Sequence, residues 1–331
     1  MSAGLTEFQA IPILDISRAG DGTAARDALA ATLSQMLSEV GFLYVRGHDV
    51  PADSIAALRA QSQAFHALPL DEKLKLKLDR NFRGYIPINT STVKTSSVAT
   101  VTKPNQSESL MLMHEVAADD PRALAGEPLQ GPNQWPDPVL LPEFRTVAET
   151  YVSQMTRLGM VMLDLIARAL GADRATLARP FERPTTFLRL LHYPPQRAEE
   201  GLFGSAPHTD YGFITLLAQD DVGGLEVRNK AGEWIAAPPI PDTFVMNVGD
   251  ILARWSNDRF ASTPHRVINR SGRERYSQPF FFDPDMRTEI VPFPSCVPAG
   301  QAPKFPPVLW QDYLMERIDK NYQSRKPAAQ A

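Results

Sequence analysis

Apolar and polar positions near the start of the chain follow two different periods. Residues 24–40 carry apolar side chains at three- and four-residue intervals, which predicts an amphipathic helix. Short apolar runs at 11–16 and 42–45 flank this segment, and Gly41 separates the helix from the second run. The pattern therefore predicts a strand–helix–strand unit.

A second helix is expected over residues 53–68, with Asp53 or Ser54 as its N-cap. The run at 74–78 alternates with period two but has charged neighbours, so helix and strand both stay open. Residues 144–170 keep one apolar face throughout and predict the longest helix, which Gly171 would end in the left-handed conformation.

Two connecting segments lack a clear period. Residues 89–109 are rich in serine and threonine and predict either short strands or a loop. Prolines recur through residues 121–142, which predicts a long irregular connection.

From residue 186 onward the apolar runs become short and are separated by glycine, proline, asparagine and aspartate, which predicts a sandwich or barrel of short strands. The predicted strands are 187–191, 213–217, 225–227, 234–236, 243–248, 265–268 and 280–282. A closing helix is expected over 305–322, with Leu309, Tyr313, Leu314 and Ile318 facing inward. We expect four regions: an N-terminal α/β region at 1–120, a connection with the long packing helix at 121–185, a strand-rich core at 186–300, and a C-terminal helix and tail at 301–331.

Composition narrows the classes of function. The chain has 34 lysines and arginines against 38 acidic residues, a net charge of −4, and no long block of one sign. This balance argues against a nucleic-acid partner and against a basic membrane-binding patch. A single cysteine, Cys296, excludes an intrachain disulfide framework and fits a reducing compartment. With no signal peptide or membrane span evident, we expect a cytoplasmic protein.

Two of the six histidines stand out by their context. His208 and Asp210 are two residues apart at the start of a predicted strand, so we expect them to share one face. His265 begins a later strand, which antiparallel packing can bring alongside. Two histidines and a carboxylate that leave three positions open are the ligands of non-haem Fe(II) oxygenases. Taken alone, the trio fits equally two solvated or capped histidines and an aspartate in a turn.

A second motif favours the interpretation of the trio as a metal site. Arg275 and Ser277 share a face of the predicted strand that follows His265. A guanidinium and a hydroxyl together bind a carboxylate well, so the pair indicates a bound dicarboxylate beside the metal. The alternative is an arginine paired with a surface glutamate.

These motifs, in this order, resemble the Fe(II)- and 2-oxoglutarate-dependent oxygenase superfamily, in its isopenicillin N synthase-like branch. The matching stretches are 41–48, 190–195, 208–217, 223–227, 247–250, 262–267 and 275–277, and the resemblance covers nearly the whole chain. It implies an α+β, mainly β fold: a distorted jelly roll (double-stranded β-helix) framed by helices. One departure is Leu191, where plant relatives carry asparagine.

The resemblance also implies the cofactors and their ligands. Fe(II) would be held by His208, Asp210 and His265. The cosubstrate 2-oxoglutarate would chelate the iron and place its distal carboxylate on Arg275 and Ser277, with Tyr193 as a further hydrogen-bond donor. O₂ would take the last open position.

The implied reaction is oxidative decarboxylation of 2-oxoglutarate coupled to hydroxylation of a small organic substrate, with desaturation or cyclisation as variants. Asp210 disfavours halogenation, because related halogenases carry a small residue there. Two other functions stay open: an oxidase of the same fold that does not use 2-oxoglutarate, and a non-catalytic jelly-roll binding protein.

Substrate contacts are harder to place from the sequence. Phe281 shares the face of Arg275 and is expected to border the substrate pocket. Arg83, Tyr85 and His114 are further candidates, together with the polar segment at 90–109, whose alternative is a surface loop. Asn247 and Asp250 are expected to form a turn, and His192 to face away from the site. The substrate and the oligomeric state stay open.

Overall fold

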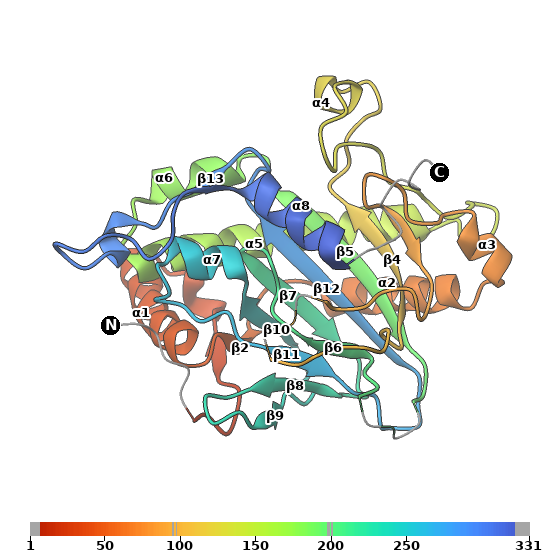
Figure 1. Cartoon of the computed structure of the whole chain (residues 1–331), viewed down its shortest axis with the longest axis horizontal. Helices are drawn as coiled ribbons and strands as arrows, with labels where there is room; N and C mark the ends of the chain where they lie inside the picture. Colours follow the sequence, from red (N-terminus) through yellow and green to blue (C-terminus); the bar gives the residue numbers. More distant parts are fainter. Residues whose placement is uncertain (1–6, 95, 97, 197–198, 200, 322–331) are drawn as a thin grey trace.

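The computed structural model describes residues 7–94, 96, 98–196, 199 and 201–321. Two β-sheets face each other, and helices cover the outer face of the larger one (Figure 1). The large sheet has eight strands and the small sheet has four. Side chains from both sheets form one of the two apolar clusters, so the space between the sheets is packed at one end.

From edge to edge the large sheet contains β1 (Ile13–Asp15), β2 (Phe42–Arg46), β10 (Thr243–Val248), β7 (Ile214–Gln219), β12 (Arg275–Asp283), β5 (Thr185–Tyr193), β4 (Glu108–Met113) and β3 (Gly84–Ile86). The small sheet contains β6 (Ser205–His208), β11 (His265–Val267), β8 (Leu225–Arg228) and β9 (Trp234–Ala236), and β13 (Glu289–Ile290) pairs with β14 (Val308–Leu309). Of the described strand pairs, β1 with β2 is parallel and the others are antiparallel.

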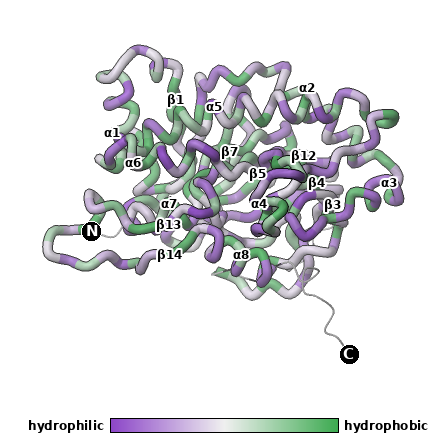
Figure 2. Tube along the Cα trace, turned by 90° about the horizontal axis from the view of Figure 1, so that it is seen from above, coloured by the Kyte–Doolittle hydropathy of each residue, from purple (hydrophilic) through white to green (hydrophobic). Residues whose placement is uncertain are grey.

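Three helices pack on one another against the large sheet: α1 (Thr23–Glu39), α2 (Ala52–His66) and α5 (Phe144–Leu170). Hydrophilic and hydrophobic residues alternate along these helices (Figure 2), as expected when one face is buried. The shorter helices are α3 (Leu70–Leu74), α4 (Pro121–Leu124), α6 (Arg174–Ala178), α7 (Asp250–Trp255) and α8 (Trp310–Asn321), with 3₁₀ turns at η1 (Ser17–Gly20), η2 (Arg179–Phe181) and η3 (Pro294–Cys296). Among the described residues, no helix has the length and apolar character to cross a membrane.

The long helix and most of the C-terminal strands lie where the sequence predicts them. Helix α5 spans the expected residues, and Gly171 ends it with φ of 62°. The closing helix is shorter than predicted: α8 begins at Trp310, because Pro306 and Pro307 precede it and β14 takes up the next two residues.

One local prediction is wrong and one is confirmed. Helix α2 begins at Ala52 after Pro51, and no side chain caps it, so neither Asp53 nor Ser54 is the N-cap. His192 faces away from the site, as predicted, and on that side its ring forms hydrogen bonds with Glu108 and Glu274 and is only 14% exposed. Both acids are distant in sequence, so the local pattern carried no sign of them.

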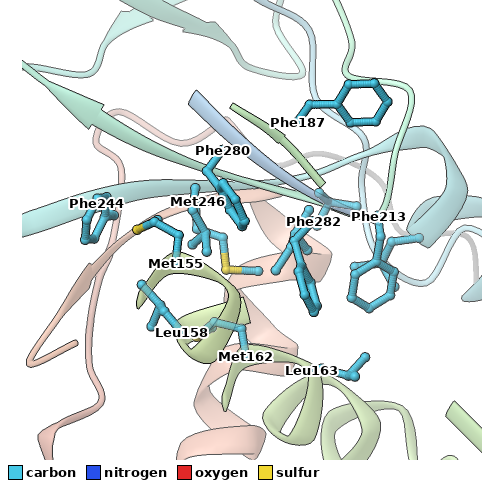
Figure 3. Packing of buried hydrophobic residues seen from close by; sticks show 14 of the residues in the cluster. Met155, Leu158, Met162, Leu163, Phe187, Phe213, Phe244, Met246, Phe280 and Phe282 are labelled. Atoms are coloured by element: carbon cyan, nitrogen blue, oxygen red, sulfur yellow. The ribbon is translucent and has the colours of Figure 1, made fainter. Parts of the chain in front are cut away.

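Alternation along β12 divides its aromatic residues between two environments. Phe280 and Phe282 are fully buried and face α5, where Met155, Leu158 and Met162 line the contact (Figure 3). Phe281 points to the opposite face, toward the small sheet. The same alternation carries the other odd-numbered residues of β12 to that inner face.

Helix α5 approaches β12 closely because residue 159 is glycine. A Cβ atom built there would lie 2.7 Å from the ring of Phe282, well inside van der Waals contact. The Phe282 ring in turn stacks on Phe181, with centroids 5.1 Å apart, so it has little room to move.

We expect Gly159→Leu to lower the free energy of unfolding by about 1–3 kcal/mol, because the added side chain overpacks the contact with Phe282. Met160→Leu, on the partly exposed face of the same helix, should change it by less than about 0.5 kcal/mol. Urea unfolding followed by circular dichroism measures both; equal stability of the two variants would contradict the close contact.

Candidate active site

His208, Asp210 and His265 converge at one end of the space between the sheets. His208 is the last residue of β6 and His265 the first of β11, and the two are register partners in the small sheet. Asp210 Oδ1 lies 3.7 Å from His208 Nε2 and 3.8 Å from His265 Nε2. One ligand atom from each residue falls within 4.8 Å of the others, the only such group among the described residues.

The trio converges by a different route from the predicted one. His208 and Asp210 were expected on one continuous strand. In the structure β6 ends at His208, and Asp210 lies in the connection to β7, which belongs to the other sheet. The crossover between sheets therefore brings the carboxylate to the two histidines.

Hydrogen bonds to backbone carbonyls set the orientation and the tautomer of the His208 and His265 rings. His208 Nδ1 donates to the carbonyl of Ala206 (2.7 Å), and His265 Nδ1 donates to the carbonyl of Thr263 (3.2 Å). With the proton on Nδ1, each Nε2 carries a free lone pair directed toward Asp210. This arrangement is typical of histidines that bind metals.

The two carboxylate oxygens of Asp210 contact different groups. Oδ2 accepts from Thr215 Oγ1 (2.5 Å) and from Asn247 Nδ2 (2.8 Å), whereas Oδ1 faces the histidines. Asn247 was predicted to form a turn; that prediction is wrong, because the residue lies inside β10 and orients this carboxylate. Asp250 begins α7 and accepts from Ser262 Oγ (2.7 Å), so it anchors a neighbouring loop.

Burial and charge keep His208 and Asp210 in their metal-binding forms. Burial, helped by the charge of His265, lowers the pKa of His208 to about 4, so its ring is neutral at pH 7. Burial alone would raise the pKa of Asp210, but the two histidines and the bonds from Thr215 and Asn247 outweigh it and hold that pKa below its usual value. Two imidazoles and one carboxylate, without thiolate, suit Fe(II).

Arg275 is a fully buried cation beside this trio. Its Nε donates to the carbonyl of Gly223, and its Nη1 lies 3.3 Å from Ser277 Oγ. The guanidinium lies 4.6 Å from the ring centroid of Tyr193. Nη2 is buried without a hydrogen-bond partner, and no described carboxylate pairs with the arginine. An orphaned donor on a buried cation fits a site for an anionic ligand.

A cavity connects Arg275 to the trio. It is lined by Arg275, Ser277 and Tyr193 at one end and by His208, Asp210 and His265 at the other. The residues predicted for a dicarboxylate and for a metal thus border one common space. A ligand that binds Arg275 at its far end would reach the trio with its near end.

A second cavity lies on the other side of His208 and Asp210. Its aromatic and apolar walls come from Phe187, Phe281 and Met111 of the large sheet and from Trp310, Leu314 and Ile318 of α8. Thr92, Val93 and Asn105 also line it, so part of the polar segment at 90–109 does reach the site. Phe281 and Arg189 border both cavities.

The structure places three of the candidate substrate residues elsewhere. Arg83, Tyr85 and His114 are not among the residues that line either cavity. Arg83 is fully buried and donates to the carbonyls of Asn81, Leu129 and His114, while the hydroxyl of Tyr85 donates to Glu108. These residues hold the N-terminal region together, a role that their sequence context does not distinguish from ligand binding.

Helix α8 closes the second cavity through its last residue. Asn321 Oδ1 accepts from the backbone N–H of Lys94 (2.7 Å), and its Nδ2 donates to the hydroxyl of Tyr211. The helix is thereby joined to the loop around residue 94 and to the connection that carries Asp210.

Comparisons with known proteins agree with this geometry. Residues 184–284 match the model of the 2OG-Fe(II) oxygenase superfamily, and residues 11–138 match that of the non-haem dioxygenase in morphine synthesis N-terminal region. Among curated proteins, the chain is 35% identical to the 2-oxoglutarate-Fe(II) type oxidoreductase hxnY of Emericella nidulans, over 94% of this chain and 90% of that one. It is 34% identical to a homoarginine-6-hydroxylase of Oryza sativa, over 96% of this chain and 99% of that one.

Solved structures show the same fold. A full-length Neurospora crassa protein in complex with alpha-KG and thymine superposes with a TM-score of 0.83 at 28% identity, covering 96% of this chain and 99% of that one. A putative 2OG-Fe(II) oxygenase family protein from Caulobacter crescentus gives 0.80 at 28% identity, over 95% and 99%. The jelly-roll fold framed by helices, predicted from the motifs, is confirmed.

We expect Thr215→Val to weaken Fe(II) binding about 10-fold, because the isosteric side chain no longer donates to Asp210 and the carboxylate is held by Asn247 alone. Thr215→Ser keeps the hydroxyl and should bind Fe(II) within about threefold of the unchanged protein. Anaerobic Fe(II) titration measures both affinities. If valine and serine gave the same affinity, the hydroxyl would have no part in orienting the carboxylate.

Proposed function

Because the chain belongs to the Fe(II)- and 2-oxoglutarate-dependent oxygenase superfamily, we propose that its two cavities bind 2-oxoglutarate and a small organic substrate on either side of one iron ion. The protein is a 2-oxoglutarate-dependent dioxygenase, and its cofactors are Fe(II), 2-oxoglutarate and O₂. The observation that carries the proposal is the common cavity between a buried, unpaired Arg275 and the His208–Asp210–His265 trio.

In this proposal the trio holds the metal. His208 Nε2, His265 Nε2 and Asp210 Oδ1 are the three ligand atoms, and the backbone carbonyls behind the rings keep them in the required tautomer. Bound Fe(II) supplies the O₂-dependent oxidation that converts 2-oxoglutarate to succinate and CO₂. The protein contributes ligands on one side only, which leaves the other side for cosubstrate and O₂.

Arg275, Ser277 and Tyr193 bind the distal carboxylate of 2-oxoglutarate. The Nη2 group that lacks a partner supplies one donor, and the hydroxyls of Ser277 and Tyr193 border the same space. Leu191, where plant relatives carry asparagine, lines the cavity as an apolar wall and offers no hydrogen bond there. Binding therefore depends on the Arg275 end.

The second cavity receives the substrate. The similar proteins include one bound to thymine and one named for homoarginine hydroxylation, both small nitrogen-containing molecules. The apolar and aromatic walls and the closure by α8 favour a compact organic molecule over a nucleic acid or a membrane lipid. Hydroxylation at a C–H bond is the proposed outcome.

We expect His208→Ala to lose succinate formation from 2-oxoglutarate, because two ligand atoms hold Fe(II) too weakly. The assay supplies Fe(II) and 2-oxoglutarate under air and measures succinate, with circular dichroism to check folding. Turnover equal to that of the unchanged protein would contradict the ligand assignment.

We expect Arg275→Ala to weaken 2-oxoglutarate binding about 10- to 100-fold, since it removes a charge-assisted hydrogen bond from a buried site. Arg273→Ala is the matched control: Arg273 lies two residues away, is 60% exposed and pairs with Asp221, so affinity should not change. The visible absorption that develops when 2-oxoglutarate is added anaerobically to the Fe(II) protein reports binding. Unchanged affinity in Arg275→Ala would place the cosubstrate elsewhere.

A further inference from the structure

Asp283 is a buried carboxyl group at the substrate end of β12. It is 2% exposed and lines the substrate cavity, but not the cavity that Arg275 borders. Alternation along the strand places Arg275, Ser277, Phe281 and Asp283 on the same inner face. Asp283 therefore follows the cosubstrate residues and Phe281 in a single row.

Only one oxygen of this carboxyl has a partner. Oδ1 accepts from the backbone N–H of Phe213 (2.6 Å). A Cβ atom on Gly212 would lie 2.0 Å from Oδ1, so the carboxyl rests directly on the main chain of residues 212 and 213. Among the described residues, no hydrogen-bond donor reaches Oδ2 and no cation pairs with Asp283.

Other buried acids in the chain are fully engaged. Glu108 accepts from Lys73, Tyr85 and His192, and Asp250 accepts from Ser262 and Tyr313. Asp283 has no such partners, and burial, with the nearby charge of Asp210, raises its pKa to about 8. A buried carboxyl is costly without partners, so an acid left half-paired against a cavity indicates a ligand group that completes it.

Arg189 provides a cation in the same cavity. Its Nε donates to Ser109 Oγ (3.0 Å), and it forms no ion pair with any described acidic residue. It lies on the inner face of β5, at the boundary between the cosubstrate and substrate cavities. Its remaining N–H groups are available to an anion or a carbonyl.

The strand register sets the distance between the backbone positions of Asp283 and Arg189. Asp283 pairs with Thr185, and Phe281 pairs with Phe187, so Arg189 lies four residues further along β5 than the level of Asp283. At about 3.3 Å per residue, the two backbone levels are roughly 13 Å apart. Between them lies the pair Phe187–Phe281, with ring centroids 6.2 Å apart in a T-shaped contact.

We propose that Asp283 is a substrate-binding residue whose free oxygen accepts a hydrogen bond from an amine, guanidine or ring N–H, in a substrate whose other end places a carboxylate or carbonyl on Arg189. The substrate is thus a small bipolar molecule with an apolar or aromatic body that lies against Phe187 and Phe281. This inference rests on the proposed function, because it requires the cavity beside the trio to hold the substrate.

Matched probes that differ by one ammonium group test the proposal. The first pair is 4-(aminomethyl)benzoate and 4-methylbenzoate; the second is 6-aminohexanoate and hexanoate. Calorimetric titration into the anaerobic protein loaded with Fe(II) and 2-oxoglutarate should show at least 10-fold tighter binding of the amine in one pair or both. No preference for the amine in either pair, including no binding of either member, would overturn the proposal.

Asp283→Asn is the variant that separates binding from structure. Asparagine keeps an oxygen to accept from Phe213, but it presents an N–H donor in place of Oδ2. The preference for the amine should fall at least 10-fold. Asp285→Asn is the control: Asp285 lies outside the residues that line the cavity and pairs with Arg122 at 3.7 Å, so the preference should persist.

The results separate a failure of the proposed function from a failure of the role assigned to Asp283. If 2-oxoglutarate does not bind the Fe(II) protein, the proposed function fails. If 2-oxoglutarate binds and the amine preference survives Asp283→Asn, the assignment of Asp283 alone is overturned. A variant that weakens both members of a pair equally shows a structural role for Asp283 and also overturns the assignment.

Discussion

The carboxylate of Asp210 is the interaction on which the site depends. One oxygen is held by Thr215 and Asn247 of the large sheet, and the other faces the two histidines of the small sheet. The residue therefore joins the two halves of the jelly roll at the point where the chain crosses between them. Because both sets of contacts are buried, the position of the carboxylate is set by the sheets and not by a flexible loop.

The inner faces of β5 and β12 carry residues that border the two cavities, on either side of Asp210. Along β12 and β5, the row begins with Arg275 and Tyr193, passes the aromatic pair Phe281 and Phe187, and ends at Asp283. A residue that can bind an anion, an apolar pair and a residue with a carboxyl group thus follow one another along the strands, at a spacing fixed by the strand geometry. Phe280 and Phe282 of β12 pack against α5 on the opposite face and hold this row in place.

Much of the fold and of the metal site could be predicted from the sequence. The long apolar face of α5 and its terminal Gly171 are local signals, and they proved sufficient. The convergence of His208, Asp210 and His265 was predictable from residue types and order, but the crossover between sheets was not, because no local pattern marks where β6 ends.

Other roles depend on contacts that are distant in the chain. Asn247 in an Asn-Val-Gly-Asp stretch has the composition of a turn, yet its partner is Asp210 in the connection between β6 and β7. Arg83 was attractive as a polar residue near an expected pocket, but it donates to the carbonyls of Leu129 and His114, which are distant in the chain, and to that of neighbouring Asn81. Asp283, after three phenylalanines, has the composition of a strand end, and only the cavity beside it reveals an unfilled oxygen.

The amide of Asn321 lies in the wall of the substrate cavity. A single side chain joins the end of α8 to two loops, by one bond to a backbone N–H and one to a tyrosine hydroxyl. The same turn of the helix carries Ile318, a member of the apolar core, so its attachment combines these hydrogen bonds, each with a net value of about 0.5–1.5 kcal/mol, with apolar burial. The end of α8 is therefore held at the wall of the substrate cavity both by the polar contacts of Asn321 and by the apolar contacts of Ile318.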